Sequence, residues 1–315
     1  MAVQRFSYEP ERVLDDFYCI PLPLHDGSPV NAFVCTDHDG VWLIDGGLDS
    51  EHCQATLRDG LQKLGFSPSD VRGILITHGH TDHVGMAPTI AANGGTIAAH
   101  ELEATVGRRL AFDENWLHRN GLPSDTTPMR WGAHAIWPDP TRFLNDGEVL
   151  RWGNLQLQVL WCPGHTPGLV CLYDARRGLV FTTDHVMRRA RAPVSLRFDS
   201  NDDPLAAYLA SVRKLGCVEA ATVLPGHGRP FGGLSQRLRQ IEHEIAHDLE
   251  VLMAALRAHG PATAYRLLPF SSAAGDRRVA ERYALSLLLA RLRHLERAGQ
   301  IVRADQNGAI HYAVS

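Results

Sequence analysis

Three imidazoles and one carboxylate stand within six positions of the chain, in the segment ILITHGHTDHVG at residues 74–85. Neutral imidazole nitrogens and carboxylate oxygens are the side-chain groups that bind zinc and related divalent ions. Because His78 and His80 are two residues apart in an extended loop, their side chains point the same way. Asp82 and His83 stand where the chain turns into the next helix. A turn with four such ligands is able to serve two metal ions.

Three later segments place ligand-type side chains at the ends of apolar, strand-like runs. His165 lies in the tight turn of CPGHTPG, Asp184 ends the run LVFTTD, and His227 lies in the turn of TVLPGHG. Together with the first segment they make five histidines and two aspartates. This is enough for a two-metal site, in which cations about 3.5–4 Å apart share a hydroxide and a carboxylate.

The elements that must position these residues alternate between strands and helices. The segment 31–47 predicts two strands joined by an Asp39-Gly40 turn, and a helix capped by Ser50 follows. A strand is predicted at 71–76, one short helix at 83–93, another strand at 96–100, and further strands between 148 and 225. Such alternation predicts an α/β sandwich.

Two segments depart from this alternation. Residues 104–142 are first helical and then rich in Pro, Trp and Gly, which indicates a helical lid insertion. After Phe231 the chain predicts two long amphipathic helices around a short one, then a hairpin with an Asn307-Gly308 turn. We therefore expect an α/β domain with the ligand-type residues over 1–232 and a helical, winged-helix-like module over 233–315.

Composition narrows the class of protein. The 315 residues are 44% hydrophobic and carry a formal net charge of −4. The total charge gives no sign of a nucleic-acid or anionic-membrane partner. The first 17 residues lack the apolar stretch of a signal peptide, and no apolar run approaches the ~20 residues that span a bilayer. Six cysteines without a CxxC pair predict reduced thiols, and we expect a cytoplasmic location.

The segment THGHTDHVG, with the later PGH, the strand-end Asp and PGHG, resembles the metallo-β-lactamase superfamily and most of all its glyoxalase II-like and LACTB2-like branch. The resemblance extends over residues 31–231 and implies a four-layer αββα sandwich with the site along one edge. It implies that His78, His80 and His165 bind a first metal, that Asp82, His83 and His227 bind a second, that Asp184 bridges them, and that Asp45 orients the metal-binding loop without ligating.

The activity that the resemblance implies is that of a binuclear metal-dependent hydrolase. A hydroxide bridging two divalent ions would attack an acyl carbonyl, with Asp82 and Asp184 holding the metals and accepting a hydrogen bond from the nucleophile. Asp184 stands where class B1 and B2 β-lactamases carry Cys, and His80 where the di-iron flavoproteins carry Glu. Both features favour Zn²⁺, with iron or manganese as alternatives. The expected substrate is an anionic thioester of the acyl-CoA or glutathione type.

Substrate contacts are less specified by the sequence. Guanidinium groups after Asp184 suit recognition of an anion, although a solvated basic loop has the same pattern. His185 either touches substrate or supports a ligand, and the aromatic residues of the insertion either line a lid or pack its helices. The residues in question are Arg188, Arg189, Arg191 and Arg197 in the loop, and Trp116, His118, Trp131 and Trp137 in the insertion.

Other activities stay open at this point. The LACTB2-like resemblance suggests an endoribonuclease acting on single-stranded RNA, for which the helix 282–297 would supply Arg291, Arg293, His294 and Arg297. A lactonase would use the same metal site, and a binding module that kept its ligands is a further alternative. The acidic total charge disfavours nucleic acid. The apolar stripe at 283–295 is expected to pack on the hydrolase domain or to support a homodimer.

Overall fold

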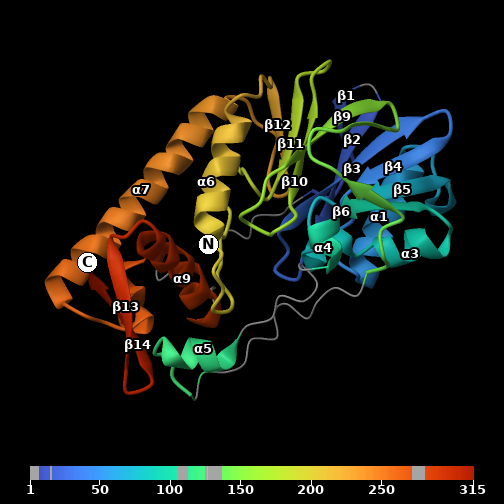
Figure 1. Cartoon of the computed structure of the whole chain (residues 1–315). Helices are drawn as coiled ribbons and strands as arrows, with labels where there is room; N and C mark the ends of the chain where they lie inside the picture. The colour runs from blue at the N-terminus through green and yellow to red at the C-terminus, as the bar shows by residue number, and fades with distance from the viewer. Residues whose placement is uncertain (1–6, 15, 106–112, 125, 127–136, 272–280) are drawn as a thin grey trace.

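A computed structural model describes residues 7–14, 16–105, 113–124, 126, 137–271 and 281–315. Its described strands form two large sheets that face each other and a separate C-terminal hairpin (Figure 1). The first sheet contains, in spatial order, β1 (Glu11–Leu14), β2 (Phe17–Pro23), β3 (Pro29–Asp37), β4 (Gly40–Ile44), β5 (Val71–Leu75), β6 (Thr96–His100) and β7 (Arg142–Leu144). The second contains β12 (Thr222–Pro225), β11 (Leu179–Thr183), β10 (Val170–Asp174), β9 (Leu155–Trp161) and β8 (Val149–Trp152).

The strand directions follow from the connections. Strands β1 to β4 pair antiparallel. The hairpin predicted between β3 and β4 is present, but its turn residues are His38 and Asp39, one position before the predicted Asp39-Gly40, because Gly40 already pairs with Asp37 as the first residue of β4. Strands β4 to β7 pair parallel because helices connect them, and β11 pairs parallel with β12 across the helix α6 (Pro204–Leu215). The carboxyl ends of β5, β11 and β12 therefore reach one edge of the sandwich.

A buried cluster of apolar side chains fills the space between the sheets. Phe17 and Phe33 from the first sheet meet Phe181 from the second, with ring centroids 5.2–5.7 Å apart. Trp152 of β8 donates its indole N–H to the carbonyl of Leu43 in β4 at 2.9 Å. Two sheets with apolar inner faces exclude water between them, and this burial is the main force that holds the sandwich together.

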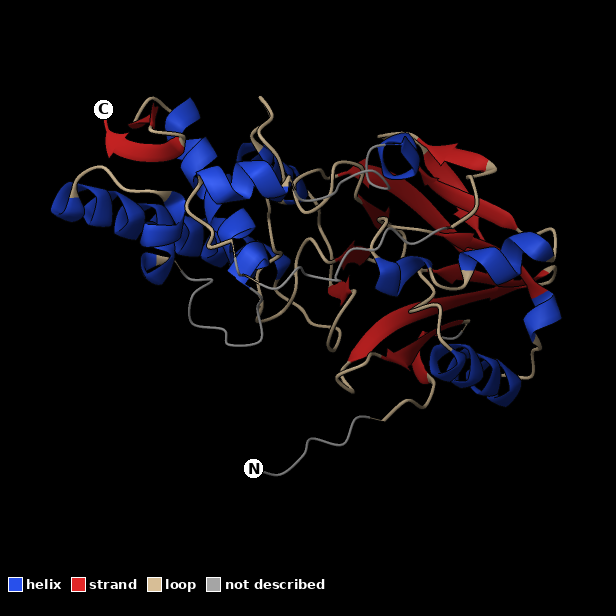
Figure 2. Cartoon of the chain, turned by 90° about the horizontal axis from the view of Figure 1, so that it is seen from below, coloured by secondary structure: helices blue, strands red, loops and turns tan. Residues whose placement is uncertain are grey.

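Helices cover the outer face of the first sheet. Helix α1 (Glu51–Lys63) begins after Ser50, whose side chain accepts the Cys53 N–H as predicted. Its buried residues Leu57 and Leu61 pack in one cluster with the outer face of the sheet, and helix α3 (Ala87–Ala92) adds Ile90 to it. Figure 2 shows helices on this side of the strands and a larger helical layer on the other side.

The single helix expected over 83–93 is wrong, because the chain forms two helices there. Helix α2 (Thr81–Val84) ends where Gly85 donates its N–H to the carbonyl of Gly47 at 2.8 Å. Helix α3 starts afresh with Pro88 in its first turn, where the missing N–H of proline costs nothing. A Cβ on Gly85 would collide with the backbone of Leu48 and Asp49, so only glycine permits this approach.

The outer face of the second sheet shares one hydrophobic cluster with α6 and with the C-terminal helices. Helix α6 contributes Tyr208 and Val212, and the long helix α7 (Leu234–His259) and α9 (Glu281–Arg297) complete it. Between them lie α8 (Ala264–Leu267) and a 3-10 turn at Leu268–Phe270. The chain is thus a four-layer αββα sandwich with a C-terminal helical region.

The C-terminal hairpin consists of β13 (Ile301–Gln306) and β14 (Ala309–Val314). Its turn lies at Asn307-Gly308 as predicted, and both residues have the positive φ that a two-residue hairpin turn requires. Helices followed by a hairpin agree with the order expected of a winged-helix-like module, although that identity and the domain boundary at residue 232 stay predictions.

Helix α7 also holds the loop that follows Asp184. Arg237 is 5% exposed and donates to the carbonyls of Met187 at 2.8 Å and Ala190 at 2.7 Å. Helix α9 adds a further contact, since the carbonyl of Ser286 accepts the Leu196 N–H at 2.9 Å. Hydrogen bonds from a charged guanidinium are stronger than neutral ones, and together with the Leu196 contact they hold the loop from both helices.

Part of the insertion packs against the C-terminal region. Helix α5 (Glu114–Arg119) lies beside α9 and β14 (Figure 1). The Glu114 carboxylate forms an ion pair with the guanidinium of Arg282 at 3.0 Å. Helix α4 (Glu101–Thr105) directly follows β6. Residues 106–112, 125 and 127–136 lie outside the described part of the chain, and the predicted lid residue Trp131 is among them.

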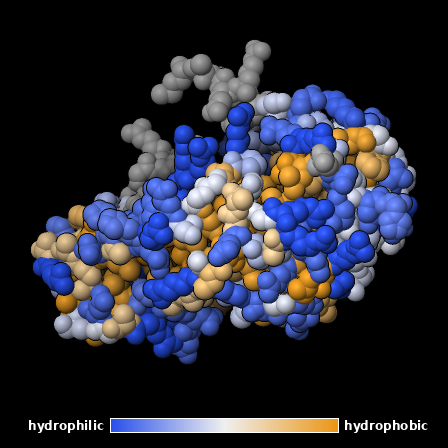
Figure 3. Space-filling view, turned by 90° about the horizontal axis from the view of Figure 1, so that it is seen from above, coloured by the Kyte–Doolittle hydropathy of each residue, from blue (hydrophilic) through white to orange (hydrophobic). Residues whose placement is uncertain are grey.

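The surface in Figure 3 mixes hydrophilic and hydrophobic side chains on the face that it shows. Within the described residues, no helix combines the length and apolar character needed to cross a bilayer.

Candidate metal centre

The predicted ligands gather at one edge of the sandwich because their strands end there. His78 follows β5, Asp184 follows β11 directly, and His227 follows β12. Asn31 of β3 ties the sheets together at this edge, since its side-chain amide donates to the carbonyls of Pro225 at 2.9 Å and Gly228 at 2.8 Å.

The first set of ligand atoms comes from three histidines. His80 Nδ1 lies 3.1 Å from His78 Nε2 and 3.0 Å from His165 Nε2. Four ligands about 2.1 Å from a tetrahedral zinc ion are separated from one another by about 3.3 Å. Asp184 Oδ2 lies 3.8 Å from His78 Nε2 and 3.7 Å from His165 Nε2, which places it as the fourth ligand atom.

The second set comes from Asp82, His83 and His227. His227 Nε2 lies 3.3 Å from Asp82 Oδ2, and His83 Nε2 lies 3.7 Å from the same oxygen. Asp184 Oδ1 lies 3.6 Å from His83 Nε2 and 3.4 Å from His227 Nε2. One oxygen of Asp184 therefore faces each set, which is the arrangement of a bridging carboxylate.

The remaining nitrogen of most of these imidazoles faces an oxygen. His83 Nδ1 lies 2.8 Å from Asp45 Oδ2, His165 Nδ1 lies 2.8 Å from the carbonyl of Pro193, and His227 Nδ1 lies 3.2 Å from the carbonyl of Pro29. Such partners fix the tautomer and orientation of a metal-binding imidazole. In each of these three rings Nε2 is then the nitrogen that is free to ligate.

Asp45 contacts the segment after β5, which carries His78, His80, Asp82 and His83. Its carboxylate accepts the backbone N–H of Thr77 at 2.9 Å and the Thr77 hydroxyl at 2.8 Å, besides facing His83. The backbone of Asp45 is left-handed, with φ of 59°, and Thr183, next to Asp184, has φ of 44°. Non-glycine residues in this region carry strain of about 1–3 kcal/mol and concentrate at functional sites.

The electrostatics of the two sets differ. Burial lowers the pKa of His78 and His165, and it lowers that of His80 to about 3, so these imidazoles stay neutral near pH 7. Burial also opposes a charge on His227, but Asp184 and Asp82 together outweigh it and raise the pKa of His227 to about 10. A cation that binds the second set therefore competes with protons.

The imidazole nitrogens and carboxylate oxygens of the two sets are suited to bind metal ions. His83 Nε2 and Asp184 Oδ1 are buried and have no hydrogen-bond partner among the described residues. A buried polar atom without a partner costs free energy, and a shared cation relieves that cost for both groups. Imidazoles with carboxylates are the donor set of zinc, iron and manganese sites.

The structure places His185 differently from the ligands. Its ring is fully buried, lies tilted against the ring of Tyr208 with centroids 4.6 Å apart, and makes no hydrogen bond to a described residue. Burial lowers the pKa of His185 to about 3, with His165 acting in the same direction. It packs beneath the site as a neutral ring, and a contact with substrate stays a prediction.

The predicted substrate residues separate into different environments. Arg188 and Arg189 are exposed in the loop after Asp184. Arg191 instead pairs with α7, 2.8 Å from Asp248 and 3.4 Å from Glu244. Burial lowers the pKa of Arg197, while Tyr283 and Glu103 nearby act in the opposite direction.

Among the described residues of the insertion, the aromatic side chains Trp116 and Trp137 are buried in apolar clusters. Trp116 is buried in the cluster that α6, α7 and α9 share, and His118 Nδ1 lies 2.9 Å from the carbonyl of Leu122. Trp137 is buried in the cluster beneath the first sheet's helices. None of these observations brings Trp116 or His118 to the ligand sets, so their contact with substrate also stays a prediction.

Two residues near the site were not identified from the sequence. Glu103 is fully buried and accepts N–H groups from both ligand loops. Its position just after a predicted strand, in AAHELE, was the signal that could have found it. Tyr283 of α9 lies close enough to Arg197, Asp184 and Asp82 for each to influence its pKa, which burial raises to about 12.

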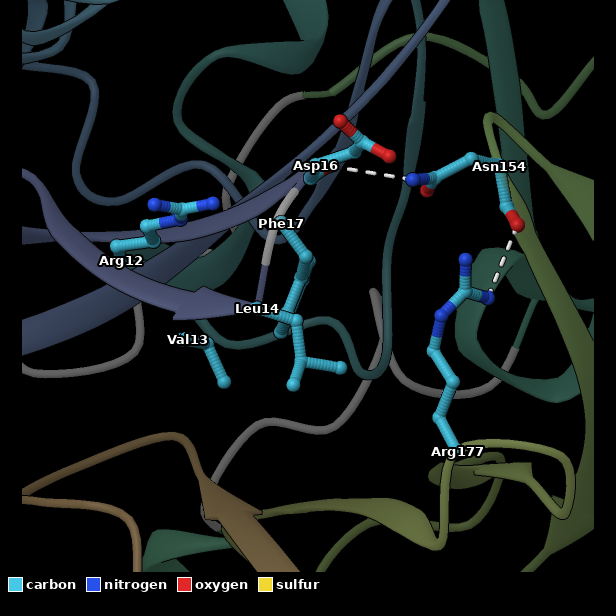
Figure 4. Close-up of a pocket in the computed structure, with 7 residues that line it drawn as sticks. All are labelled: Arg12, Val13, Leu14, Asp16, Phe17, Asn154 and Arg177. Carbon is cyan, nitrogen blue, oxygen red and sulfur yellow. Dashed lines mark hydrogen bonds between the residues drawn. The ribbon is translucent and has the colours of Figure 1, made fainter.

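Two other features lie apart from the ligand sets. A surface pocket of about 560 Å³ is lined by residues of β1 and of the turns near Asn154 and Arg177 (Figure 4), and none of the predicted ligands lines it. A second group of acidic and histidine side chains, Asp37, His38 and Asp39, belongs to the turn between β3 and β4, where His38 and Asp39 are exposed.

Several known proteins are similar to this chain in sequence. The chain is 29% identical over 213 residues to "Acyl-coenzyme A thioesterase MBLAC2" of Gallus gallus, covering 61% of this chain and 73% of that protein. It is 26% identical over 166 residues to "Hydroxyacylglutathione hydrolase GloC" of Haemophilus influenzae, covering 50% and 68%. An uncharacterized protein of Aquifex aeolicus is 30% identical over 157 residues, which is 49% of this chain and 64% of that protein.

The fold comparison extends over nearly the whole chain. A metallo-beta-lactamase family protein of Thermus thermophilus superimposes with a TM-score of 0.85 at 28% identity, covering 96% of this chain and 100% of that one. The family model of the metallo-beta-lactamase superfamily matches residues 25–227, a range that contains all seven predicted ligands. The chain therefore belongs to the metallo-beta-lactamase superfamily, whose members include metal-dependent hydrolases.

Proposed function

We propose that this protein is a binuclear metal-dependent hydrolase of anionic thioesters, of the acyl-CoA or glutathione type. The observation that carries the proposal is the position of Asp184, whose two carboxylate oxygens each face a separate set of ligand atoms. Three histidines complete the first set, and Asp82, His83 and His227 complete the second. Two Zn²⁺ ions suit these donors, with iron or manganese as alternatives.

Residues of the chain itself would bind the metal ions and orient the attacking water. Divalent ions held there would lower the pKa of water toward neutrality and polarise an acyl carbonyl. The carboxylates of Asp82 and Asp184 would hold these ions and would accept a hydrogen bond from the attacking water. A thiolate leaving group is stable near neutral pH, so a thioester needs no separate general acid.

The charge around the first set supports an anionic substrate. Arg197 lies close enough to His80 to act on its pKa, and Tyr283 of α9 lies near the same guanidinium. The relatives named for acyl-coenzyme A and hydroxyacylglutathione agree with this choice, because both of those molecules are anionic. We infer that substrate enters between the ligand sets and α9, with its anionic group toward Arg197.

The basic residues of α9 do not favour the endoribonuclease alternative. Arg291 pairs with Asp248 at 3.3 Å, Arg293 with Asp199 at 2.6 Å, and His294 with Asp203 at 2.9 Å. Arg297 donates to the carbonyl of Asn201. Binding of RNA through this helix would require phosphates to compete with these partners.

A substrate panel on one metal-analysed preparation tests the proposal. We expect about two metal ions per chain and turnover of an acyl-CoA or of S-lactoylglutathione, measured by release of free thiol. The panel also contains an acyl-homoserine lactone, nitrocefin and a single-stranded RNA. Cleavage of the lactone or of RNA, with no thiol release from either thioester, would replace the proposed activity with that one.

Reversing the charge of two exposed arginines tests how the substrate is held. In the double variant Arg188→Glu/Arg189→Glu, we expect the KM for an acyl-CoA to rise ~5-fold, because exposed ion pairs contribute at most ~1 kcal/mol each. The kcat should stay within about twofold. The matched control is Arg176→Glu, an exposed arginine at the other end of β11. Equal KM values for wild type and double variant would exclude a role of Arg188 and Arg189 in binding.

A further inference from the structure

Glu103 is a fully buried carboxylate that belongs to neither ligand set. It stands in α4, just after β6, and its side chain has no exposed surface. Its Oε2 accepts the backbone N–H of Gly79 at 2.6 Å, and its Oε1 accepts the backbone N–H of Gly168 at 2.6 Å. One side chain therefore joins two loops that lie far apart in the sequence.

Both loops carry metal ligands of the first set. Gly79 lies between His78 and His80, and Gly168 lies three residues after His165. The loops come from different sheets, since the first follows β5 and the second follows β9. The distance between His80 Nδ1 and His165 Nε2, 3.0 Å, thus depends on how these two loops are held relative to each other.

The close approach of Glu103 to both loops explains why positions 79 and 168 are glycine. A Cβ on Gly79 would lie 2.9 Å from Glu103 Oε2, and a Cβ on Gly168 would lie 2.7 Å from the backbone nitrogen of Glu103 and 3.0 Å from Oε1. Neither position leaves room for a side chain while the carboxylate is in place. The backbone of each loop therefore approaches Glu103 as closely as glycine allows.

Burying the Glu103 carboxylate costs free energy, and favourable contacts must offset that cost. Burial raises the pKa of Glu103. The Thr166 hydroxyl, the N–H groups of Gly79 and Gly168, and the cation of Arg197 act in the opposite direction. Hydrogen bonds to an ionised acceptor are short and strong, which agrees with the two distances of 2.6 Å. A carboxylate accepts the N–H of each loop on a separate oxygen, whereas an amide of the same shape has one accepting oxygen and places N–H donors at the other position.

We propose that Glu103 is a positioning residue that joins the two ligand loops and thereby sets the affinity and geometry of the three-histidine metal site. It acts through the backbone of Gly79 and Gly168 and does not ligate. The inference rests on the proposed metal-binding role of His78, His80 and His165, but not on the identity of the substrate.

The test replaces the carboxylate by its isosteric amide. In Glu103→Gln the side-chain nitrogen must face one of the two backbone N–H groups, so one hydrogen bond is lost and the shape is kept. Glu101→Gln is the matched control, because Glu101 is exposed at the start of the same helix. Zn²⁺ affinity is measured by competition with a chromophoric chelator, and Co²⁺ absorption reports the geometry of each site.

We expect Glu103→Gln to weaken the three-histidine Zn²⁺ site roughly 10–100-fold, the range found when a partner of a ligand is removed. The Co²⁺ bands of that site should shift, the other site should change by less than about threefold, and Glu101→Gln should match wild type. Unchanged affinity and Co²⁺ bands in Glu103→Gln would overturn the inference. An equal loss at both sites, with a loss of folded protein, would reduce Glu103 to a structural residue.

A second variant guards against misfolding of the first. Gly79 has no positive φ, so Gly79→Ala keeps an allowed backbone while its Cβ pushes the Glu103 carboxylate away. We expect the same selective weakening of one site, and unchanged binding would again overturn the inference. These readouts need no substrate. A protein that binds metal normally but hydrolyses no thioester would contradict the proposed function and leave this inference standing.

Discussion

Replacement of Asp184 by alanine is expected to abolish hydrolysis, with kcat/KM falling ~10³-fold or more. One carboxylate serves both ligand sets, so its loss removes a ligand from each. Metal ions contribute several kcal/mol to stabilising charge in the transition state of such reactions, and each ~1.4 kcal/mol corresponds to about tenfold in rate. Steady-state kinetics and metal content per chain are the measurements.

The fold should survive this change. Asp184 follows β11 and takes no part in its pairing with β12, which ends at Thr183, so we expect the alanine variant to keep the sheet pairing. We expect circular dichroism spectra equal to wild type and a metal content below one ion per chain. Asp202→Ala is the control, since Asp202 is exposed in the segment before α6. Wild-type turnover by the Asp184 variant would exclude the bridging assignment.

Removal of the metal ions is expected to have an effect of similar size. Dialysis against a strong chelator should reduce thioester hydrolysis to background, and one preparation reloaded in turn with Zn²⁺, Mn²⁺ or Fe²⁺ should identify the ion that restores it. The thermal unfolding midpoint should also fall on removal. A ligand at roughly 1,000 times its Kd stabilises the folded state by about 4 kcal/mol, and the metal-free protein loses this contribution.

This experiment has its own internal control. The chelator must be removed before assay, and the Asp184→Ala variant should respond little to either treatment because it holds less metal from the start. Full activity in protein that elemental analysis shows to be free of metal would contradict the proposed chemistry. Recovery with only one ion per chain would contradict a two-metal requirement while leaving a single-metal hydrolase.

The sequence allowed the ligands to be predicted because each lies in a short local pattern. His165 and His227 each follow a strand within a Pro-Gly turn, and strand ends meet at one edge of a sheet, so the side chains converge without any knowledge of packing. The strands, the Ser50 cap and the Asn307-Gly308 hairpin were predictable for the same reason.

What could not be predicted depends on partners far away in the chain. In the sequence, Glu103 and Arg237 look like ordinary surface residues of helices. The fold buries Glu103 against two loops 24 and 65 positions away, and Arg237 against one loop 47 to 50 positions away. Trp116 has the aromatic character of a lid residue, but periodicity does not say which apolar cluster an aromatic ring enters. The break between α2 and α3 came from the approach of Gly85 to the backbone of residues 47–49.

The parallel pairing of β11 with β12 imposes an order on the biosynthesis of the site. A ribosome delivers His78, His80, Asp82 and His83 first, about 100 positions before Asp184 and about 145 before His227. Until β12 emerges and pairs with β11, the nascent chain lacks His227 and its second ligand set is incomplete, and the contacts from α7 and α9 to the loop after Asp184 come later still. Tight capture of both ions must therefore wait until the second sheet has closed, and contacts of such long sequence separation form late in folding.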